Sequence, residues 1–414
     1  MHRFRIVILM SVFLFGITQI YIAINSFDSS PGQHSTIDPD KLTPLVLELP
    51  EETGQIGNLY AREALLMDGD TGRVLYEKEG YTRAAMASTT KIMTAVYVIE
   101  NCDLNDIASV SKKAAAQPKV HMGAAEGEKY KVQDLLYALM LESYNDCAVI
   151  LAEHVSGSVN QFCKAMTEKA KELGCEDTNF ETPNGLDSDS HYTTPYDLAK
   201  ITKYALENET FSDIVRTREY SFSEYSGKRQ VTVSNKDSFL SRYEGAIGVK
   251  TGFTGKAGYC FVGAVKHDGR YLISVVLGSG WPPHKTYKWD DTIALMKYGE
   301  ANYKKCQIIK SQNRIGQIEV SHGAASTVPV YIDGSKTTLL SKRDKVETKL
   351  HMKKQLEAPV RKNQKAGTLS IYVNEECVET LDIRTVKKMG KETFIMVLEH
   401  NIKYMIPGGR YNGT

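Results

Sequence analysis

Residues 86–95 read MASTTKIMTA, in which Ser88 stands three residues before Lys91 at the start of an apolar, helix-like run. Positions i and i+3 share one face of a helix, with Cβ atoms about 5–6 Å apart. Serine needs a neighbouring base to become a nucleophile, and lysine is that base only when burial or a second cation lowers its pKa. The pair is either catalytic or part of a solvated surface helix, because Ser109 and Lys112 repeat the same spacing.

A second polar group follows an amphipathic run, at Ser143-Tyr144-Asn145 in the stretch LESYNDCA. The position fits a loop between helices, where a hydroxyl and an amide two residues apart could both face a cleft. Ser143 could then relay a proton, and Asn145 could bind a substrate amide. The alternative is a turn capped by its own serine or asparagine side chain.

The third group is Lys250-Thr251-Gly252 in GAIGVKTGFTGKAGYC, the only Lys-Thr-Gly of the chain. We expect it on an inner strand of a sheet, where lysine and threonine can hold a carboxylate and glycine lets a ligand approach the backbone. Lys250 could also be the second cation that keeps Lys91 neutral. The alternative is an edge-strand lysine that serves solubility.

The order SxxK, SxN and KTG, with SxxK at a strand-to-helix junction, is a named combination. With it the sequence resembles the penicillin-binding proteins and serine β-lactamases, and more narrowly the D-alanyl-D-alanine carboxypeptidases of low molecular mass. The resemblance runs from about Asn58 to Tyr303, through stretches such as LMDGDTGRVLYEK and FETPNGLDSDSHYTTPYDLAKIT. It implies an α+β fold: a β-lactamase/transpeptidase-like domain with an antiparallel sheet and a helical subdomain, followed by a small all-β domain.

The resemblance also implies roles for individual residues. Ser88 would be the acylated nucleophile, Lys91 its base, and Ser143 and Asn145 would line the cleft. Substrate binding would fall to the strand residues Lys250, Thr251, Gly252 and Phe253, and the oxyanion hole to the backbone N–H groups of Ser88 and Phe253. The reaction would release the terminal D-alanine of peptidoglycan stem peptides and then hydrolyse the acyl-enzyme. β-Lactams would be covalent inhibitors, and no cofactor is implied.

The length of 414 residues predicts more than one folded domain. Strand patterns at both ends of the first half, with helical periodicity between them, predict one sheet built from distant segments and covered by helices. Short alternating runs beyond residue 305 predict a separate β domain. We predict five segments: an N-terminal signal or anchor (1–26), a linker (27–55), the peptidase domain (56–304), the β domain (305–400) and a tail (401–414).

The N-terminal segment carries Arg3 and Arg5 followed by an uncharged run from Ile6 to Ile24. This run is nearer the length of a membrane-spanning helix than that of a secretory signal, and no convincing cleavage site follows it. Either reading predicts an exported protein, at the outer face of the membrane if the segment is retained and secreted if it is cleaved. The end of the chain lacks the basic amphipathic helix of many relatives, so this segment is the only evident anchor.

Composition excludes other classes of function. A formal net charge of +1 gives no reason to expect a nucleic-acid partner. Seven cysteines without a CxxC spacing make a disulfide framework unexpected. Ten histidines without an HxxH or HExxH pair give no motif for a metal site, and we predict none.

Two other functions remain open from the sequence. A class A β-lactamase would carry a Glu-x-x-Leu-Asn stretch, which is absent, and would lack the long β domain. A non-enzymatic penicillin-binding sensor or structural wall protein would have lost Ser88, Lys91 or Lys250, and all three are present. The sequence leaves the role of Arg270 open: Tyr271 stands where relatives often carry a basic residue, and a shift of one residue on a strand changes the face.

Overall fold

The computed structural model describes residues 37, 55–311 and 313–396, and the chain divides into two compact units. One unit comprises Glu52–Lys304, and the other comprises Lys305–Thr414 together with Met1–Glu51. Within the described residues, no helix is both long and apolar enough to cross a membrane. The apolar segment predicted as a signal or anchor lies outside the described residues.

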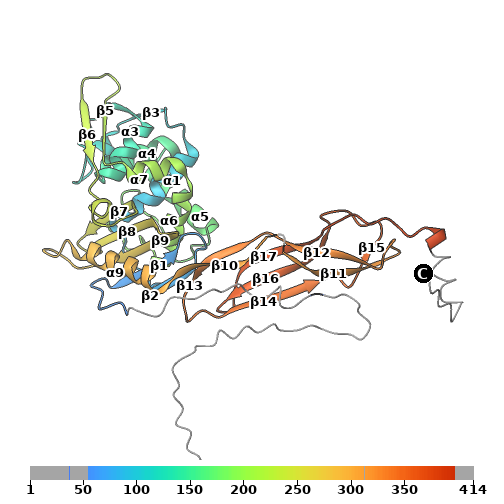
Figure 1. The fold of residues 1–414 in the computed structure, drawn as a ribbon. Coiled ribbons are helices and arrows are strands. Elements are labelled where there is room, and N and C mark those ends of the chain that lie inside the picture. The colour runs from blue at the N-terminus through green and yellow to red at the C-terminus, as the bar shows by residue number, and fades with distance from the viewer. Residues whose placement is uncertain (1–36, 38–54, 312, 397–414) are drawn as a thin grey trace, which may run out of the picture. The chain divides into compact units, whose positions relative to one another are not determined.

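The first unit is built on a five-stranded antiparallel sheet with the strand order β2-β1-β9-β8-β7 (Figure 1). Its strands come from distant segments: β1 (Glu63–Asp68), β2 (Val74–Lys78), β7 (Ala246–Thr254), β8 (Gly258–His267) and β9 (Arg270–Leu277). β7 is an edge strand, as is β2, so the expectation of an inner strand for Lys250 was wrong. The stretch GYCFVGAVKHDGRYLISVVLG predicts a hairpin with its turn at residues 267–270, and the structure confirms it, since His267 pairs with Arg270.

Helices cover both faces of this sheet. On β9, Leu272 packs against Gly299 of helix α9 (Tyr287–Asn302), whereas the adjacent Tyr271 lines a cavity with Leu206 of helix α6 (Pro195–Glu207). Neighbouring residues of a strand point to opposite faces, so α9 and α6 lie on opposite sides. Figure 1 shows α1, α3, α4, α5 and α7 gathered on the α6 side as a helical layer.

The helical layer contains one short 3₁₀ helix, η2 (Ala87–Thr90), and α-helices with well-defined ends. Ser158, Thr194 and Asn208 accept hydrogen bonds from backbone N–H groups in the first turns of α5, α6 and α7. Besides α6, the α-helices of this layer are α1 (Lys91–Asn101), α2 (Lys112–Ala115), α3 (Val132–Leu141), α4 (Asn145–Ser156), α5 (Val159–Glu172) and α7 (Glu209–Arg216). The short helix α8 (Phe239–Arg242) lies on the α9 side, where Arg242 stacks over Trp289. Two hairpins accompany them: β3 (Ile107–Ser109) with β4 (Lys129–Lys131), and β5 (Glu219–Ser223) with β6 (Gln230–Ser234).

The second unit is all β in its described part. Six strands form one sheet in the order β14-β16-β17-β12-β11-β15, and β10 pairs with β13. Alternating valine, isoleucine and leucine side chains fill its core. The strands are β10 (Lys304–Ile309), β11 (Arg314–Ser321), β12 (Thr327–Asp333), β13 (Lys336–Leu340), β14 (Val346–Met352), β15 (Leu356–Glu357), β16 (Lys365–Val373) and β17 (Glu376–Thr385). Ile37, within the predicted linker, forms an isolated bridge with Gly316 of β11.

Candidate active site

Ser88 lies in η2, and Lys91 is the first residue of α1, which follows directly. The Nζ atom of Lys91 lies 2.9 Å from the Oγ atom of Ser88. Lys91 is fully buried, and its Nζ also donates to Asn145 Oδ1 at 3.0 Å and to the backbone oxygen of Asn184 at 2.6 Å. A neutral amine has two hydrogens and one lone pair. The two fixed oxygens therefore take both hydrogens, and the lone pair is left facing the serine hydroxyl.

The surroundings of Lys91 favour that neutral form. Burial lowers its pKa well below the usual value, and the positive charge of Lys250 lowers it further. Lys250, on β7, is 2% exposed, and burial lowers its pKa to about 7 while the charges of Asp237 and Glu142 oppose that shift. Two buried lysines thus share one site, and the charge of Lys250 disfavours a second cation close to Ser88.

The second predicted group meets the first at Asn145, which begins α4 and is buried. Its Oδ1 accepts from Lys91, and its Nδ2 donates to the backbone oxygen of Pro118 at 3.1 Å. Ser143, two residues earlier, has a left-handed backbone conformation with φ of 67°. It is half-buried, and its hydroxyl has no hydrogen-bond partner among the described residues, so it is available to a ligand.

The third predicted group, Lys250-Thr251-Gly252, lies on β7 beside the backbone of Ser88. A Cβ atom added to Gly252 would lie 3.0 Å from the backbone nitrogen of Ser88. Glycine is therefore needed for β7 to approach η2 this closely. Thr251 is half-buried, and Phe253 is 43% exposed with its ring packed against Tyr259. Residues 250–253 thus pass beside Ser88 on the edge strand of the sheet.

Three contributors were missed by sequence reasoning. Asn184 supplies a backbone oxygen to Lys91 from the Pro183-Asn184-Gly185 turn, and a Cβ atom on Gly185 would lie 2.0 Å from the backbone oxygen of Ala87. The sequence Pro-Asn-Gly indicates a turn, but every residue has a backbone carbonyl, so the residue type could not reveal that this one binds Lys91. Asp237, 6% exposed, has its pKa raised by burial to about 7 and faces the charge of Lys250. No motif marked it.

Asp146 is the third, and it fixes the wall of the site. Its buried carboxylate accepts hydrogen bonds from the backbone nitrogens of Met122, Gly123 and Ala124 at 2.9, 2.8 and 3.2 Å, and from that of Cys147 at 3.0 Å. Pro118, whose backbone oxygen accepts from Asn145, lies four residues before this stretch. In the sequence, the only indication of this role was that Asp146 directly follows the asparagine of the SxN group.

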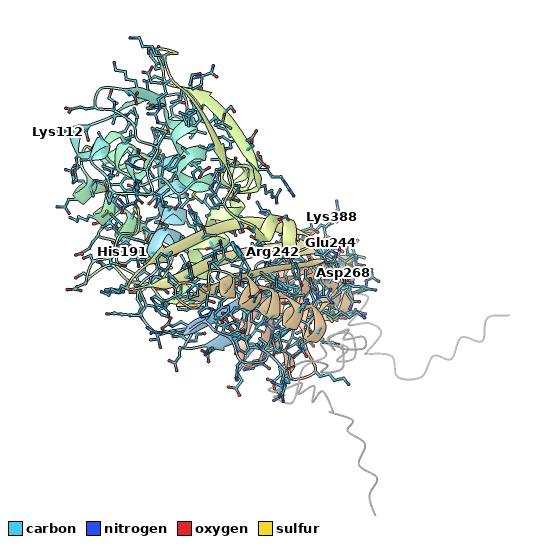
Figure 2. All side chains as sticks on the ribbon, turned by 90° about the vertical axis from the view of Figure 1, so that its left-hand side faces the viewer. Lys112, His191, Arg242, Glu244, Asp268 and Lys388 are labelled. Carbon is cyan, nitrogen blue, oxygen red and sulfur yellow. The ribbon has the colours of Figure 1, made fainter. Side chains whose placement is uncertain are left out.

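Other candidate residues lie away from the site. Arg270 contacts Asp268 and the backbone oxygens of Tyr303 and Glu300, at the β8–β9 turn. Figure 2 shows Asp268 at the opposite side of the unit from His191, whose Nε2 lies 2.8 Å from Thr90 Oγ1 beside the nucleophile. Arg270 is thus not a ligand of this site.

His191 is not a base for Ser88. Its Nδ1 accepts from the backbone nitrogen of Glu181 at 3.0 Å, and burial lowers its pKa to about 4. The repeated SxxK spacing is also explained: Ser109 lies on β3 and Lys112 on α2, and both are exposed. Figure 2 shows Lys112 at the surface of the unit. Of the two pairs, only Ser88–Lys91 joins a polar network, with Lys91 buried and Ser88 half-buried.

Comparison with known proteins agrees with this geometry. Residues 50–280 match the D-alanyl-D-alanine carboxypeptidase family, and residues 303–391 match the C-terminal domain of penicillin-binding protein 5. The D-alanyl-D-alanine carboxypeptidase DacF of Bacillus subtilis is 29% identical over 95% of this chain and 97% of its own length. A D-alanyl-D-alanine carboxypeptidase of a Streptomyces species, strain K15, is 36% identical over 57% of this chain and 85% of its own.

Solved structures are similar as well. The Streptomyces K15 DD-transpeptidase superposes with a TM-score of 0.57 at 34% identity, covering 60% of this chain and all of that one. Penicillin-binding protein 5 from Haemophilus influenzae superposes with a TM-score of 0.67 at 24% identity, covering 82% of this chain and 100% of that one. The second likeness confirms the predicted fold, including the all-β C-terminal domain.

Proposed function

The chain belongs to the D-alanyl-D-alanine carboxypeptidase family, and from this membership we infer that it is a serine hydrolase that removes the terminal D-alanine of peptidoglycan pentapeptide stems. Its ligands are peptidoglycan stem peptides, and β-lactams are expected to acylate it as they do penicillin-binding proteins. This reaction has two steps, the acylation of a serine and the hydrolysis of the resulting ester, and each step needs residues assigned to it.

We propose that Ser88 is the nucleophile and Lys91 the base. In acylation, the hydroxyl proton of Ser88 passes to the lone pair of Lys91 Nζ while Oγ bonds to the carbonyl carbon of the penultimate D-alanine. The C–N bond to the terminal D-alanine then breaks, and its amine takes a proton as it leaves. Support comes from the 2.9 Å separation of Nζ and Oγ and from the two oxygens that hold the amine hydrogens.

We propose that the edge strand β7 receives the substrate. An edge strand presents N–H and C=O groups that an extended peptide can pair with, and β7 is the edge next to Ser88. The charge of Lys250, with the hydroxyl of Thr251, would hold the terminal carboxylate. The backbone N–H groups of Ser88 and Phe253 would hold the oxyanion, and the close approach at Gly252 brings these two segments together.

Deacylation requires a water to lose a proton as it attacks the ester. We propose that Lys91 accepts this proton and returns one to Ser88 Oγ, because it already contacts that atom. Asn145 would orient the acyl chain, and Ser143, with its free hydroxyl, would pass the proton to the departing amine in the first step. Each step leaves the enzyme in its starting protonation state.

One observation carries the proposal: the buried amine of Lys91 is bound by two fixed oxygens, and its lone pair faces Ser88. The test is D-alanine release from a pentapeptide ending in D-Ala-D-Ala, followed with D-amino acid oxidase. Ser88→Ala and Lys91→Met should each reduce release by at least about 10³-fold. The matched controls Ser109→Ala and Lys112→Met, at the exposed SxxK spacing, should retain wild-type release. Equal losses in both pairs would refute the assignment.

We also propose a cellular location for the protein and boundaries for its domains. The apolar segment from Ile6 to Ile24 would hold it at the outer face of the cytoplasmic membrane. The peptidase domain would span residues 56–304, and the β domain 305–400 would act as a spacer or interaction module. Fractionation of cells tests the anchor: full-length protein in the membrane fraction supports it, and a shortened chain in the medium contradicts it.

A further inference from the structure

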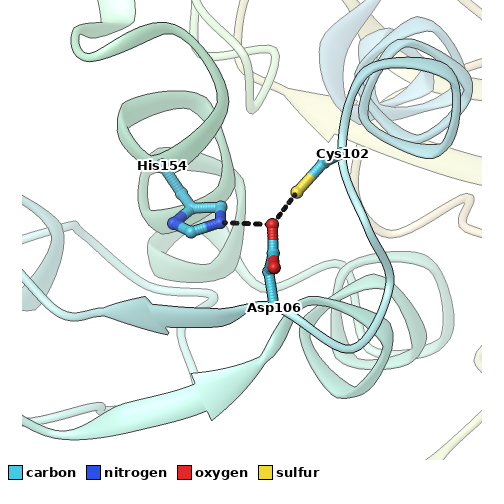
Figure 3. Close-up of side chains that lie close together, drawn as sticks. All are labelled: Cys102, Asp106 and His154. Atoms are coloured by element: carbon cyan, nitrogen blue, oxygen red, sulfur yellow. Dashed lines mark hydrogen bonds and ion pairs between the residues drawn. The ribbon is translucent and has the colours of Figure 1, made fainter.

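Three side chains with metal-binding chemistry meet on the surface of the helical layer, away from Ser88 (Figure 3). Cys102 follows the last residue of α1, Asp106 precedes β3, and His154 lies in the last turn of α4. The Sγ, carboxylate and imidazole ligand atoms all lie within 4.8 Å of one another. The two segments are far apart in the sequence, so no HxxH or CxxC spacing could reveal them.

The distances fit a small ion with tetrahedral geometry. Asp106 Oδ2 lies 3.5 Å from Cys102 Sγ and 3.6 Å from His154 Nε2. Neighbouring ligands of a tetrahedral Zn²⁺ lie roughly 3.4–3.6 Å apart, given bond lengths of about 2.0–2.3 Å. Two edges of the ligand triangle therefore already have the required length. Only the edge between Cys102 and His154 has to shorten, from 4.8 Å or less to roughly 3.5 Å, which a side-chain rotation can supply.

Charge and ligand type select the ion. A thiolate and a carboxylate together carry two negative charges, and a neutral imidazole adds none, so the set neutralises a dication. Within the part of the chain that the structure describes, no lysine or arginine forms an ion pair with Asp106. One sulfur and one nitrogen ligand favour Zn²⁺ over Mg²⁺ and Ca²⁺, which prefer oxygen ligands.

We propose that Cys102, Asp106 and His154 bind one Zn²⁺-class ion, with water as the fourth ligand, and that the ion clamps the ends of α1 and α4. The placement gives this clamp a purpose. α1 begins with Lys91 and α4 begins with Asn145, so both helices carry a residue of the active site at one end and a ligand region at the other. Eleven residues of α1 span about 16 Å, so the ion would act on helix positions and not on the reaction.

The test uses Co²⁺ as a spectroscopic probe on the purified full-length chain, after chelator treatment under a thiol-free reductant. A background with Cys377→Ser removes the exposed competing thiol, since the other cysteines are buried. We expect one Co²⁺ per chain, with a thiolate-to-cobalt charge-transfer band that Zn²⁺ abolishes by displacement. Cys102→Ser should remove the band, and Asp106→Asn or His154→Ala should weaken binding at least about tenfold. Zn²⁺ should also raise the thermal midpoint of unfolding by about 5 °C or more.

The readouts separate binding from loss of fold and from the peptidase reaction. Penicillin labelling of Ser88 should persist in Cys102→Ser, which shows that this variant is folded. Absence of a charge-transfer band would overturn the proposal, as would a band that survives Cys102→Ser. A thermal shift of equal size in wild type and Cys102→Ser would overturn it too. In those cases the three side chains form only a hydrogen-bonded surface cluster.

Discussion

Asp146→Asn is the substitution that most clearly separates the wall of the active site from its chemistry. The buried carboxylate accepts four backbone N–H groups, two on each oxygen. An asparagine keeps one oxygen and replaces the other by an NH₂ group, which cannot accept. Two buried N–H groups therefore lose a partner. Hydrogen bonds to a charged group contribute about 1.5–3 kcal/mol each, so we expect a loss of about 3–6 kcal/mol in the free energy of unfolding.

The loss should reach the reaction through the segment that Asp146 holds. Pro118 and Val120 bind Asn145 through their backbone oxygens, at 3.1 and 2.8 Å, and Gln117 binds the side chain of Asn184 at 3.0 Å. Asn145 and Asn184 are the two groups that hold the hydrogens of Lys91. A displaced segment frees both, so the lone pair of Lys91 no longer points steadily at Ser88. We expect penicillin acylation to slow at least about tenfold at pH 7.

The charge of Asp146 itself does not explain such a loss. Burial and the charge of Lys250 lower the pKa of Lys91, whereas Asp146 raises it. Removing that carboxylate charge therefore favours the neutral, reactive amine, and electrostatics alone predict no slowing.

The assay pairs urea unfolding with the second-order rate constant for acylation by a fluorescent penicillin. Asp290→Asn is the matched control, because Asp290 is exposed on α9 and far from these contacts in sequence and structure. The control should change stability by less than about 0.5 kcal/mol. An Asp146→Asn protein that acylates within twofold of wild type, or whose stability matches that of the control, would contradict this role of Asp146.

Three further predictions concern charge, packing and the second unit. Burial lowers the pKa of Lys250 to about 7, so its positive charge is present below that pH and lost above it. The acylation rate constant should therefore decline above pH 7, and Lys250→Arg should flatten that decline; an unchanged alkaline limb would contradict this role. Gly252→Ala places a Cβ atom 3.0 Å from Ser88 N and should slow acylation about tenfold or more, whereas Gly57→Ala, with open space around it, should not. Gly367→Ala places a Cβ atom 2.3 Å from the backbone oxygen of His351 and should lower the thermal stability of the β unit while penicillin labelling stays normal; slowed labelling would show that the units are coupled.

The sequence predicted the parts of the fold that local patterns encode. The pattern Asp-Gly-Asp-Thr-Gly at residues 68–72 predicts a turn between two strands, and there Asp68 accepts from Thr71 and from the backbone nitrogen of Asp70. The amphipathic run NQFCKAMTEKAKELG predicts a helix that stops at Gly174; α5 ends two residues earlier, and Gly174 has a positive φ of 72°. The run DDTIALMKYGEANY predicts a helix from Asp290, and α9 begins earlier, at Tyr287. The α+β class follows from such elements, because strands at both ends of a helical region have few ways to pack.

The position of Lys250 could not be predicted in the same way. Strand order depends on which segments pair, and β7 pairs with β8 alone. An edge strand is usually recognised by exposed polar residues, yet residues 247–250 are all buried. The helical layer and the nucleophile segment cover this strand, so its burial pattern is that of an inner strand.

The SxxK, SxN and KTG groups could be predicted from the sequence because their side chains act directly. The residues that hold these groups in position could not be predicted in this way. Asn184 acts through its backbone oxygen, and Asp146 acts through hydrogen bonds to a segment some twenty residues earlier in the chain. Such contacts depend on tertiary structure and leave no spacing in the sequence. The same holds for Cys102, Asp106 and His154, which only the packing of α4 against the loop after α1 brings together.

Peptide mapping by mass spectrometry after penicillin treatment measures the identity of the nucleophile most directly. We predict one penicilloyl group per chain, on the peptide that contains Ser88, and no adduct in Ser88→Ala under the same conditions. An adduct on another residue, or one that persists at full yield in Ser88→Ala, would contradict the assignment of the buried lysine and its serine as the reactive pair.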